Sequence, residues 1–200
     1  MERVEMEFMY KNLIGLTGGI GAGKSVVARV LRTKGLGVYD CDLRAKILME
    51  ESQELREALK GRFGTECYGE DNTLNRAFLS KRIFSSDEDR RWLNALVHEA
   101  VRKDLGEWCG NRRDEVKFVE SAILHTSGLD SVCSSIWLVM APIEMRFQRA
   151  LQRGGIDGEN IRARMKAQED EFKSLPVSKV EILDNSGMSS LLSRIDSLLL

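Results

Sequence analysis

The chain has 200 residues, 42 % of them hydrophobic, and a formal net charge of −1. This size suits one domain, or one domain with insertions, and the near-neutral charge argues against a general nucleic-acid binder. No apolar run approaches the roughly 18–20 residues of a membrane span, and the polar, acidic opening MERVEMEFMYKN does not resemble a signal peptide. The four cysteines are scattered and form no CxxC pair, so we expect a reducing, cytoplasmic setting without disulfides or a cysteine-bound metal.

Strand-like and helix-like patterns alternate along the chain. The pattern predicts strands, in chain order, at Leu13–Thr17, 36–40, 116–120, 135–141 and within 180–187. It predicts helices at Gly23–Thr33, Leu43–Glu51, Gln53–Phe63, 74–84, 85–109, after Pro142, at Glu159–Phe172 and at the C-terminus. Ser86 and Asp87 are candidate caps of the long helix, whose buried stripe is expected at Trp92, Leu93, Leu96 and Val97.

This alternation predicts an α/β fold with a central parallel sheet and helices on both faces. The stretch from Leu43 to Cys109 contains no strand pattern. We therefore expect it to form a helical lobe inserted between two strands, where it would hold a substrate.

The most specific motif is the glycine-rich stretch GLTGGIGAGKSVV, which runs from Gly15 to Val27. The spacing Gly18-x-x-x-x-Gly23-Lys24-Ser25 matches the phosphate-binding P-loop at every defined position. Such glycines let successive backbone N–H groups point at one phosphate, the lysine reaches the outer phosphates, and the serine hydroxyl ligates Mg²⁺. The predicted nucleotide contacts are Gly18, Gly21, Ala22, Gly23, Lys24, Ser25 and Val26. A dinucleotide-binding GxGxxG fingerprint does not fit any register of this stretch.

Acidic residues follow two of the predicted strands. Asp40 ends the second strand and Asp42 lies two residues later, and Glu120 ends the third strand. Carboxyl ends of parallel strands share one edge of a sheet with the P-loop. Asp42 is therefore the candidate general base for a hydroxyl, with a helix N-cap as the alternative. Glu120 is a second candidate Mg²⁺ ligand and substrate contact, or else a solvated loop acid.

Arg146, Arg149 and Arg153 follow i, i+3, i+7 spacing and share one helix face before Gly154-Gly155. Such a face suits a lid that closes on phosphates, although a solvent-exposed charged face has the same spacing. His98 ends an apolar stripe, where a histidine is usually structural. The segment Asp184–Gly187 is by itself only a turn signal.

The chain closely resembles the dephospho-coenzyme A kinases from Leu13 almost to its end. The resemblance is carried by the P-loop GLTGGIGAGKS, the DCD segment, the stretch DNTLNRAFLSKRIFSSDEDRRWLNALVHEAV, the helix RFQRALQR and the loop LDNSG. The P-loop is common to many kinases, whereas the long lobe stretch and LDNSG are much more specific.

The resemblance implies a three-layer P-loop kinase fold of one domain. Its nucleotide-binding core would comprise residues 10–42, 112–145 and 177–200, its helical substrate lobe 43–111 and its lid segment 146–176. It also implies ATP and Mg²⁺ as cofactors and phosphorylation of the ribose 3′-hydroxyl of dephospho-CoA. Charge and hydropathy lead us to expect no nucleic-acid or membrane partner, and we expect a monomer or weak homo-oligomer, although the sequence does not reveal the oligomeric state. The implied roles are catalytic for Lys24, Asp42 and Arg149, ATP-binding for Arg153 and Asn185, and substrate-binding for Asp42, Arg82, His98 and Glu120.

Three positions depart from the family pattern. Thr126 stands where a glutamate is expected, Glu99 follows His98 in place of a proline, and Lys46 replaces a usual arginine. These positions bear on substrate contacts, whereas Lys24, Ser25 and Asp42 are intact. Two other functions share the same motifs: a nucleoside-monophosphate-type kinase and a nucleotide-gated binding protein without transfer activity.

Overall fold

The computed structural model describes residues 10–112, 115–155 and 157–200. Backbone contacts divide the chain into two compact units. The first unit comprises the chain up to Asp40 and from Cys109 onward, and the second is the continuous segment Cys41–Trp108. The second unit therefore interrupts the first, and we refer to it as the helical unit.

The first unit is built on a five-stranded sheet with the order β2-β3-β1-β4-β5. All four strand pairings are parallel, which confirms the predicted α/β fold with a central parallel sheet. The strands are β1 (Leu13–Thr17), β2 (Gly37–Asp40), β3 (Lys117–Glu120), β4 (Ser135–Met140) and β5 (Val180–Asp184). Because parallel strands point the same way, the loops that leave their carboxyl ends share one edge of the sheet.

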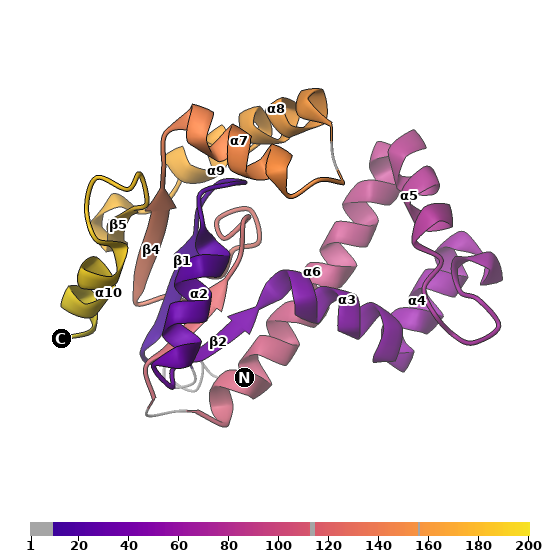
Figure 1. Ribbon diagram of the computed structural model, residues 1–200. Coiled ribbons are helices and arrows are strands. Elements are labelled where there is room, and N and C mark those ends of the chain that lie inside the picture. Colours follow the sequence, from indigo (N-terminus) through magenta and orange to yellow (C-terminus); the bar gives the residue numbers. More distant parts are fainter. Residues whose placement is uncertain (1–9, 113–114, 156) are drawn as a thin grey trace. The chain divides into compact units, whose positions relative to one another are not determined.

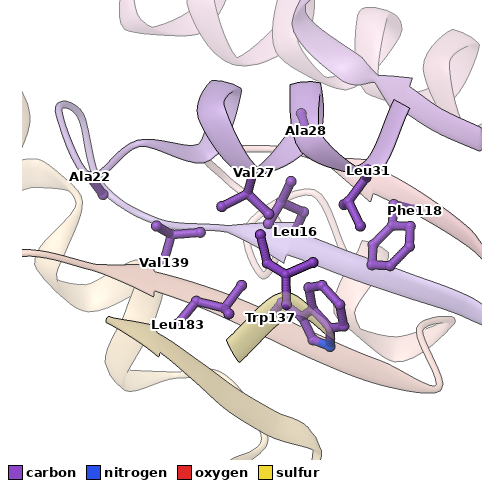
Figure 2. Close-up of a cluster of buried hydrophobic side chains, with 10 residues drawn as sticks. Leu16, Ala22, Val27, Ala28, Leu31, Phe118, Trp137, Val139 and Leu183 are labelled. Carbon is purple, nitrogen blue, oxygen red and sulfur yellow. The ribbon is translucent and has the colours of Figure 1, made fainter. Parts of the chain in front are cut away.

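One face of this sheet is covered by α2 (Lys24–Thr33) and α10 (Leu191–Leu199), which pack on a common hydrophobic core. Figure 2 shows Val27 and Leu31 of α2 directed at Leu16 of the central strand. The rings of Phe118 and Trp137 meet edge to face with centroids 4.9 Å apart. This buried face holds α2 against β1, and thereby fixes the loop that joins them.

Three further helices lie beyond the carboxyl ends of β1 and β4 (Figure 1): α7 (Ile143–Gln152), α8 (Gly158–Ala167) and α9 (Glu169–Lys173). Ala150, Ile161 and Met165 form their small core. The sequence predicts one helix over Glu159–Phe172, but the structure interrupts it at Gln168. Pro142 is the N-cap of α7, so this helix begins directly after Pro142, as the sequence predicts. Short 3-10 helices occur at Leu129–Ser131 and Val177–Lys179.

The helical unit contains α3 (Cys41–Glu51), α4 (Gln53–Phe63), the 3-10 turn Thr65–Cys67, α5 (Arg76–Ser85) and most of α6 (Asp87–Gly110). Its core confirms the predicted stripe, because Leu93 is buried and Trp92, Leu96 and Val97 pack against the same cluster. The Ser86 hydroxyl accepts the Asp89 N–H at 3.2 Å, so Ser86 caps α6. Among the described residues, no helix is both long and apolar enough to cross a membrane.

Candidate active site

The loop between β1 and α2 has a backbone that only glycine tolerates at two key points. Gly21 has φ +76° and Gly23 has φ +107°, both in the left-handed region that L side chains rarely adopt. A Cβ on Gly21 would lie 2.0 Å from the Arg146 carbonyl oxygen, and one on Gly23 would lie 2.2 Å from the Asn185 side-chain nitrogen. The glycines therefore allow both an unusual backbone and close packing.

The start of α2 is suited to bind an anion. Gly23 caps the helix without a side-chain hydrogen bond, and the first turn contains no acidic residue. No carboxylate in the first turn of α2 therefore offsets the positive end of the helix dipole. The Lys24 ammonium curls back and donates a hydrogen bond to the Gly18 carbonyl at 2.6 Å. Ser25 is exposed in the same turn.

A cavity of about 380 Å³ lies beside this loop. It is lined by Gly21, Gly23, Val26, Arg149, Gln152, Arg153 and Asn185. The structure thus gathers predicted nucleotide contacts from the P-loop, from α7 and from the loop after β5 around one space. Gln152 is an addition, because nothing in the sequence pattern singled out its side chain.

Hydrogen bonds join the three parts of this cavity wall. The Asn185 side chain donates to the Ala22 carbonyl at 2.8 Å, and Arg149 Nη2 donates to the Asn185 carbonyl at 3.1 Å. Arg149 Nη1 is buried and has no hydrogen-bond partner among the described residues. A buried guanidinium nitrogen without an acceptor is costly, and an anion bound beside Arg149 is the kind of group that would satisfy it. Together with the P-loop and the arginines that line the cavity, this donor suits a ligand that carries phosphate groups.

Arg146 of the same helix packs directly on the P-loop. Its Nε donates to the Ile20 carbonyl at 3.1 Å, while its Nη2 is buried without a hydrogen-bond partner in the described part of the chain. Burial lowers the pKa of the Arg146 guanidinium, and the nearby Glu169 carboxylate opposes this shift. The arginine spacing placed Arg146 on the lid face, but only the structure reveals its contact with the loop.

Two carboxylates lie side by side at the carboxyl edge of the sheet. Asp40 of β2 pairs in register with Glu120 of β3, and Glu120 in turn pairs with Leu16 of β1. In-register side chains of parallel strands point to the same face, so both acids lie on the face that α2 covers. Both are half-buried. The described residues contain no cluster of three or more His, Cys, Asp or Glu side chains suited to a metal.

The remaining predicted residues belong to the helical unit. Asp42 is exposed in the first turn of α3, and the helix already begins at Cys41, so Asp42 is not its N-cap. Arg82 of α5 is exposed, with its guanidinium carbon 5.4 Å from the centroid of the Phe78 ring. His98 of α6 is half-buried, and burial together with the charge of Arg102 lowers its pKa.

Thr126 has a definite role in the packing of the first unit. Its hydroxyl and its N–H donate to Glu171 of α9 at 2.6 and 3.1 Å, and the His125 N–H donates to the same carboxylate. Glu171 is buried. The other two departures lie in the helical unit: Lys46 on α3, and Glu99 on α6, where it lines a cavity of about 300 Å³ within that unit.

A parallel sheet, a P-loop on its central strand and arginines facing the loop define a P-loop kinase-type phosphotransferase. Comparison with known proteins makes this more specific. The family model for dephospho-CoA kinase matches residues 12–190, so the chain belongs to the dephospho-CoA kinase family.

The relatives agree with this assignment. The dephospho-CoA kinase of Porphyromonas gingivalis is 44 % identical over 158 residues, covering 79 % of this chain and 78 % of the relative. That of Deinococcus radiodurans is 38 % identical, covering 87 % and 84 % of the two chains. The crystal structure of TT1252 from Thermus thermophilus superposes with a TM-score of 0.74 at 33 % identity, covering 94 % of this chain and 93 % of that one. A dephospho-CoA kinase structure from Campylobacter jejuni shares the fold, with a TM-score of 0.69 at 20 % identity over 94 % and 95 % of the chains.

Proposed function

We propose that this protein transfers the γ-phosphoryl group of ATP to the ribose 3′-hydroxyl of dephospho-CoA, giving coenzyme A and ADP. The observation that carries the proposal is the cavity between the P-loop and α7. Arg149 lines this cavity, and its guanidinium has a buried Nη1 without a hydrogen-bond partner among the described residues. Membership of the dephospho-CoA kinase family supplies the acceptor.

In the proposed mechanism the P-loop N–H groups and the N-terminus of α2 bind the β-phosphate region. Lys24 leaves the Gly18 carbonyl, 2.6 Å away in the structure, to pair with the outer phosphates. Arg149 and Arg153 then neutralise the charge that develops on the transferring group. Transfer is direct and in line, so no covalent enzyme intermediate forms.

Asp42 is the proposed general base. Its carboxylate accepts a hydrogen bond from the acceptor hydroxyl and takes the proton as the new P–O bond forms. The support is that Asp42 is exposed and lies two residues beyond Asp40, which ends β2 at the same sheet edge as the P-loop. Arg82 and His98 are proposed substrate contacts in the helical unit.

Mg²⁺ fits the residues near the loop. The exposed Ser25 hydroxyl and the half-buried Glu120 carboxylate are the oxygen donors that this ion prefers, with Glu120 reaching it directly or through water. When bound, Mg²⁺ would offset negative charge on the phosphates. Few protein ligands are expected, because Mg²⁺ in kinase sites is held largely by phosphates and water.

We further propose that the enzyme acts in the cytoplasm as a monomer or weak homo-oligomer, without a nucleic-acid partner. All four cysteines are buried thiols that form no disulfide, which suits a reducing compartment. The net charge of −1 offers no general attraction for nucleic acid. Light scattering across a concentration series would reveal a stable higher oligomer and so contradict this proposal.

The acceptor is tested by incubating the protein with Mg²⁺-ATP and dephospho-CoA and analysing the products by mass. We expect the acceptor to gain one phosphoryl group, which a 3′-nucleotidase then removes. AMP and CMP serve as parallel acceptors. Phosphorylation of these with dephospho-CoA inert would favour a nucleoside-monophosphate-type kinase, and nucleotide binding without any acceptor-dependent ADP would leave only a binding protein.

A further inference from the structure

The peptide of Ile20, in the middle of the P-loop, is held from both sides by residues outside the loop. Its N–H donates to the Gln168 side-chain oxygen at 2.8 Å, and its carbonyl accepts from Arg146 Nε at 3.1 Å. The Ile20 side chain packs against the small core of Ala150, Ile161 and Met165. One loop residue therefore touches α7, α8 and the junction that follows α8.

Arg146 fits the loop so closely that it leaves no room for a side chain there. A Cβ on Gly19 would lie 1.9 Å from Arg146 Nη2, and a Cβ on Gly21 would lie 2.0 Å from the Arg146 carbonyl oxygen. Arg146 thus contacts both residues that flank Ile20. This contact fixes the loop conformation, because glycines alone would leave that backbone many alternatives.

Gln168 is held in place by a separate loop. It occupies the break between α8 and α9, and Glu171 one turn later accepts hydrogen bonds from His125 and Thr126 in the loop after β3. The buried Glu171 carboxylate therefore anchors α9 to the core of the first unit. Gln168 therefore reaches Ile20 from a segment that is anchored three residues later.

We propose that Arg146 and Gln168 are positioning residues for the nucleotide, which act by holding the Ile20 peptide. Fixing this peptide sets the directions of the neighbouring N–H groups before the phosphates arrive, and a preorganised loop loses less entropy on binding. The proposal deepens the proposed nucleotide-binding function and rests on it, but it is independent of the acceptor.

The test compares Gln168→Met and Arg146→Met with Arg164→Met. The first two remove one hydrogen bond each to Ile20, and the control removes a positive charge from an exposed position on α8. Binding of Mg²⁺-ADP is measured by calorimetry, and exchange of the Ile20 amide is measured without nucleotide. A hydrogen bond with a net value of about 1 kcal/mol corresponds to roughly a fivefold change in affinity. We expect Gln168→Met and Arg146→Met to weaken the binding of Mg²⁺-ADP about five- to tenfold. The affinity of Arg164→Met should stay within about twofold of the parent protein.

The Ile20 amide distinguishes positioning from general destabilisation. We expect its exchange to accelerate at least tenfold in Gln168→Met, while the Val27 amide within α2 stays protected. A protein that is merely less stable would bind fewer equivalents of Mg²⁺-ADP with unchanged affinity. Unchanged affinity in both variants, or an Ile20 amide that already exchanges freely in the parent protein, overturns the proposal. Should Gln168→Met not fold, Arg146→Met alone decides, and a parent protein that binds no Mg²⁺-ADP refutes the nucleotide site itself.

Discussion

Replacing Gly21 by alanine tests whether the P-loop and α7 form one rigid arrangement. Gly21 has φ +76°, and the left-handed conformation costs an L residue about 1–2 kcal/mol. Its new Cβ would also lie 2.0 Å from the Arg146 carbonyl oxygen, so the loop and helix must separate by roughly 1.4 Å to reach the 3.4 Å at which ordinary contact begins. Overpacking of this kind costs about 1–3 kcal/mol more, which brings the total to about 2–5 kcal/mol.

Gly35→Ala is the matched control, because Gly35 has φ +82° but a Cβ added there would have nothing within 4 Å. We expect Gly35→Ala to lower the melting temperature by about 2–8 °C, with kcat/KM unchanged. In Gly21→Ala the displaced α7 carries Arg149 away from the loop, and a shift of about 1 Å can cost 10²-fold in rate. The assay couples ADP release to NADH oxidation with dephospho-CoA as acceptor. If Gly21→Ala loses no more activity than Gly35→Ala, the packing of α7 against the P-loop does not matter for activity, and the reasoning is refuted.

Four further substitutions test individual roles. Lys24→Met should remove most of the transfer activity while the circular dichroism spectrum stays unchanged, because Lys24 is half-buried and its ammonium group bonds a loop carbonyl. Near-normal turnover would remove Lys24 from the mechanism. Asp42→Asn should lower kcat by roughly 10²–10⁴ with ATP affinity within a few-fold, and an unchanged kcat would leave it a spectator. Arg149→Ala should reduce kcat more than ATP affinity if its contact forms mainly in the transition state; loss of affinity alone would make it a ground-state contact. Asp130 accepts a hydrogen bond from His125 at 2.7 Å and raises its pKa above the ordinary value of about 6.5. The resulting stabilisation is fully present below pH 6.5 and is lost as pH rises through the raised pKa of His125. Asp130→Asn should therefore flatten this part of the profile of unfolding free energy against pH, measured by urea unfolding. An unaltered profile would refute the assignment.

Local sequence patterns predicted the bounds of a helix or strand closely where neighbouring residues alone set them. The strand Leu13–Thr17 and the helix Gln53–Phe63 begin and end as expected, because apolar periodicity and the Ser52 cap act within a few residues. The helix predicted over Glu159–Phe172 is the clearest failure. Its break at Gln168 coincides with a hydrogen bond to Ile20, 148 residues away, which no local pattern contains.

The candidate site likewise has features that local sequence predicts and features that depend on distant contacts. The spacing from Gly18 to Ser25 predicted a phosphate loop, because the loop's function depends on backbone freedom and charge within a few neighbouring residues. The arginine spacing indicated a shared helix face, yet it gave no reason to distinguish Arg146 from Arg149. In the structure Arg146 supports Ile20. Arg149 lines the cavity, and its buried Nη1 has no hydrogen-bond partner among the described residues.

The sequence by itself therefore determined the parallel α/β fold, the P-loop and the family resemblance, since each depends on periodicity or on short-range spacing. Only the tertiary structure decided which side chains from distant segments meet. It brought Asn185 to the Ala22 carbonyl, Asp40 into register with Glu120, and Thr126 to the buried Glu171. These contacts depend on strand order and on how α7 to α9 pack over the sheet edge, and both are set by burial of apolar surface across the whole first unit.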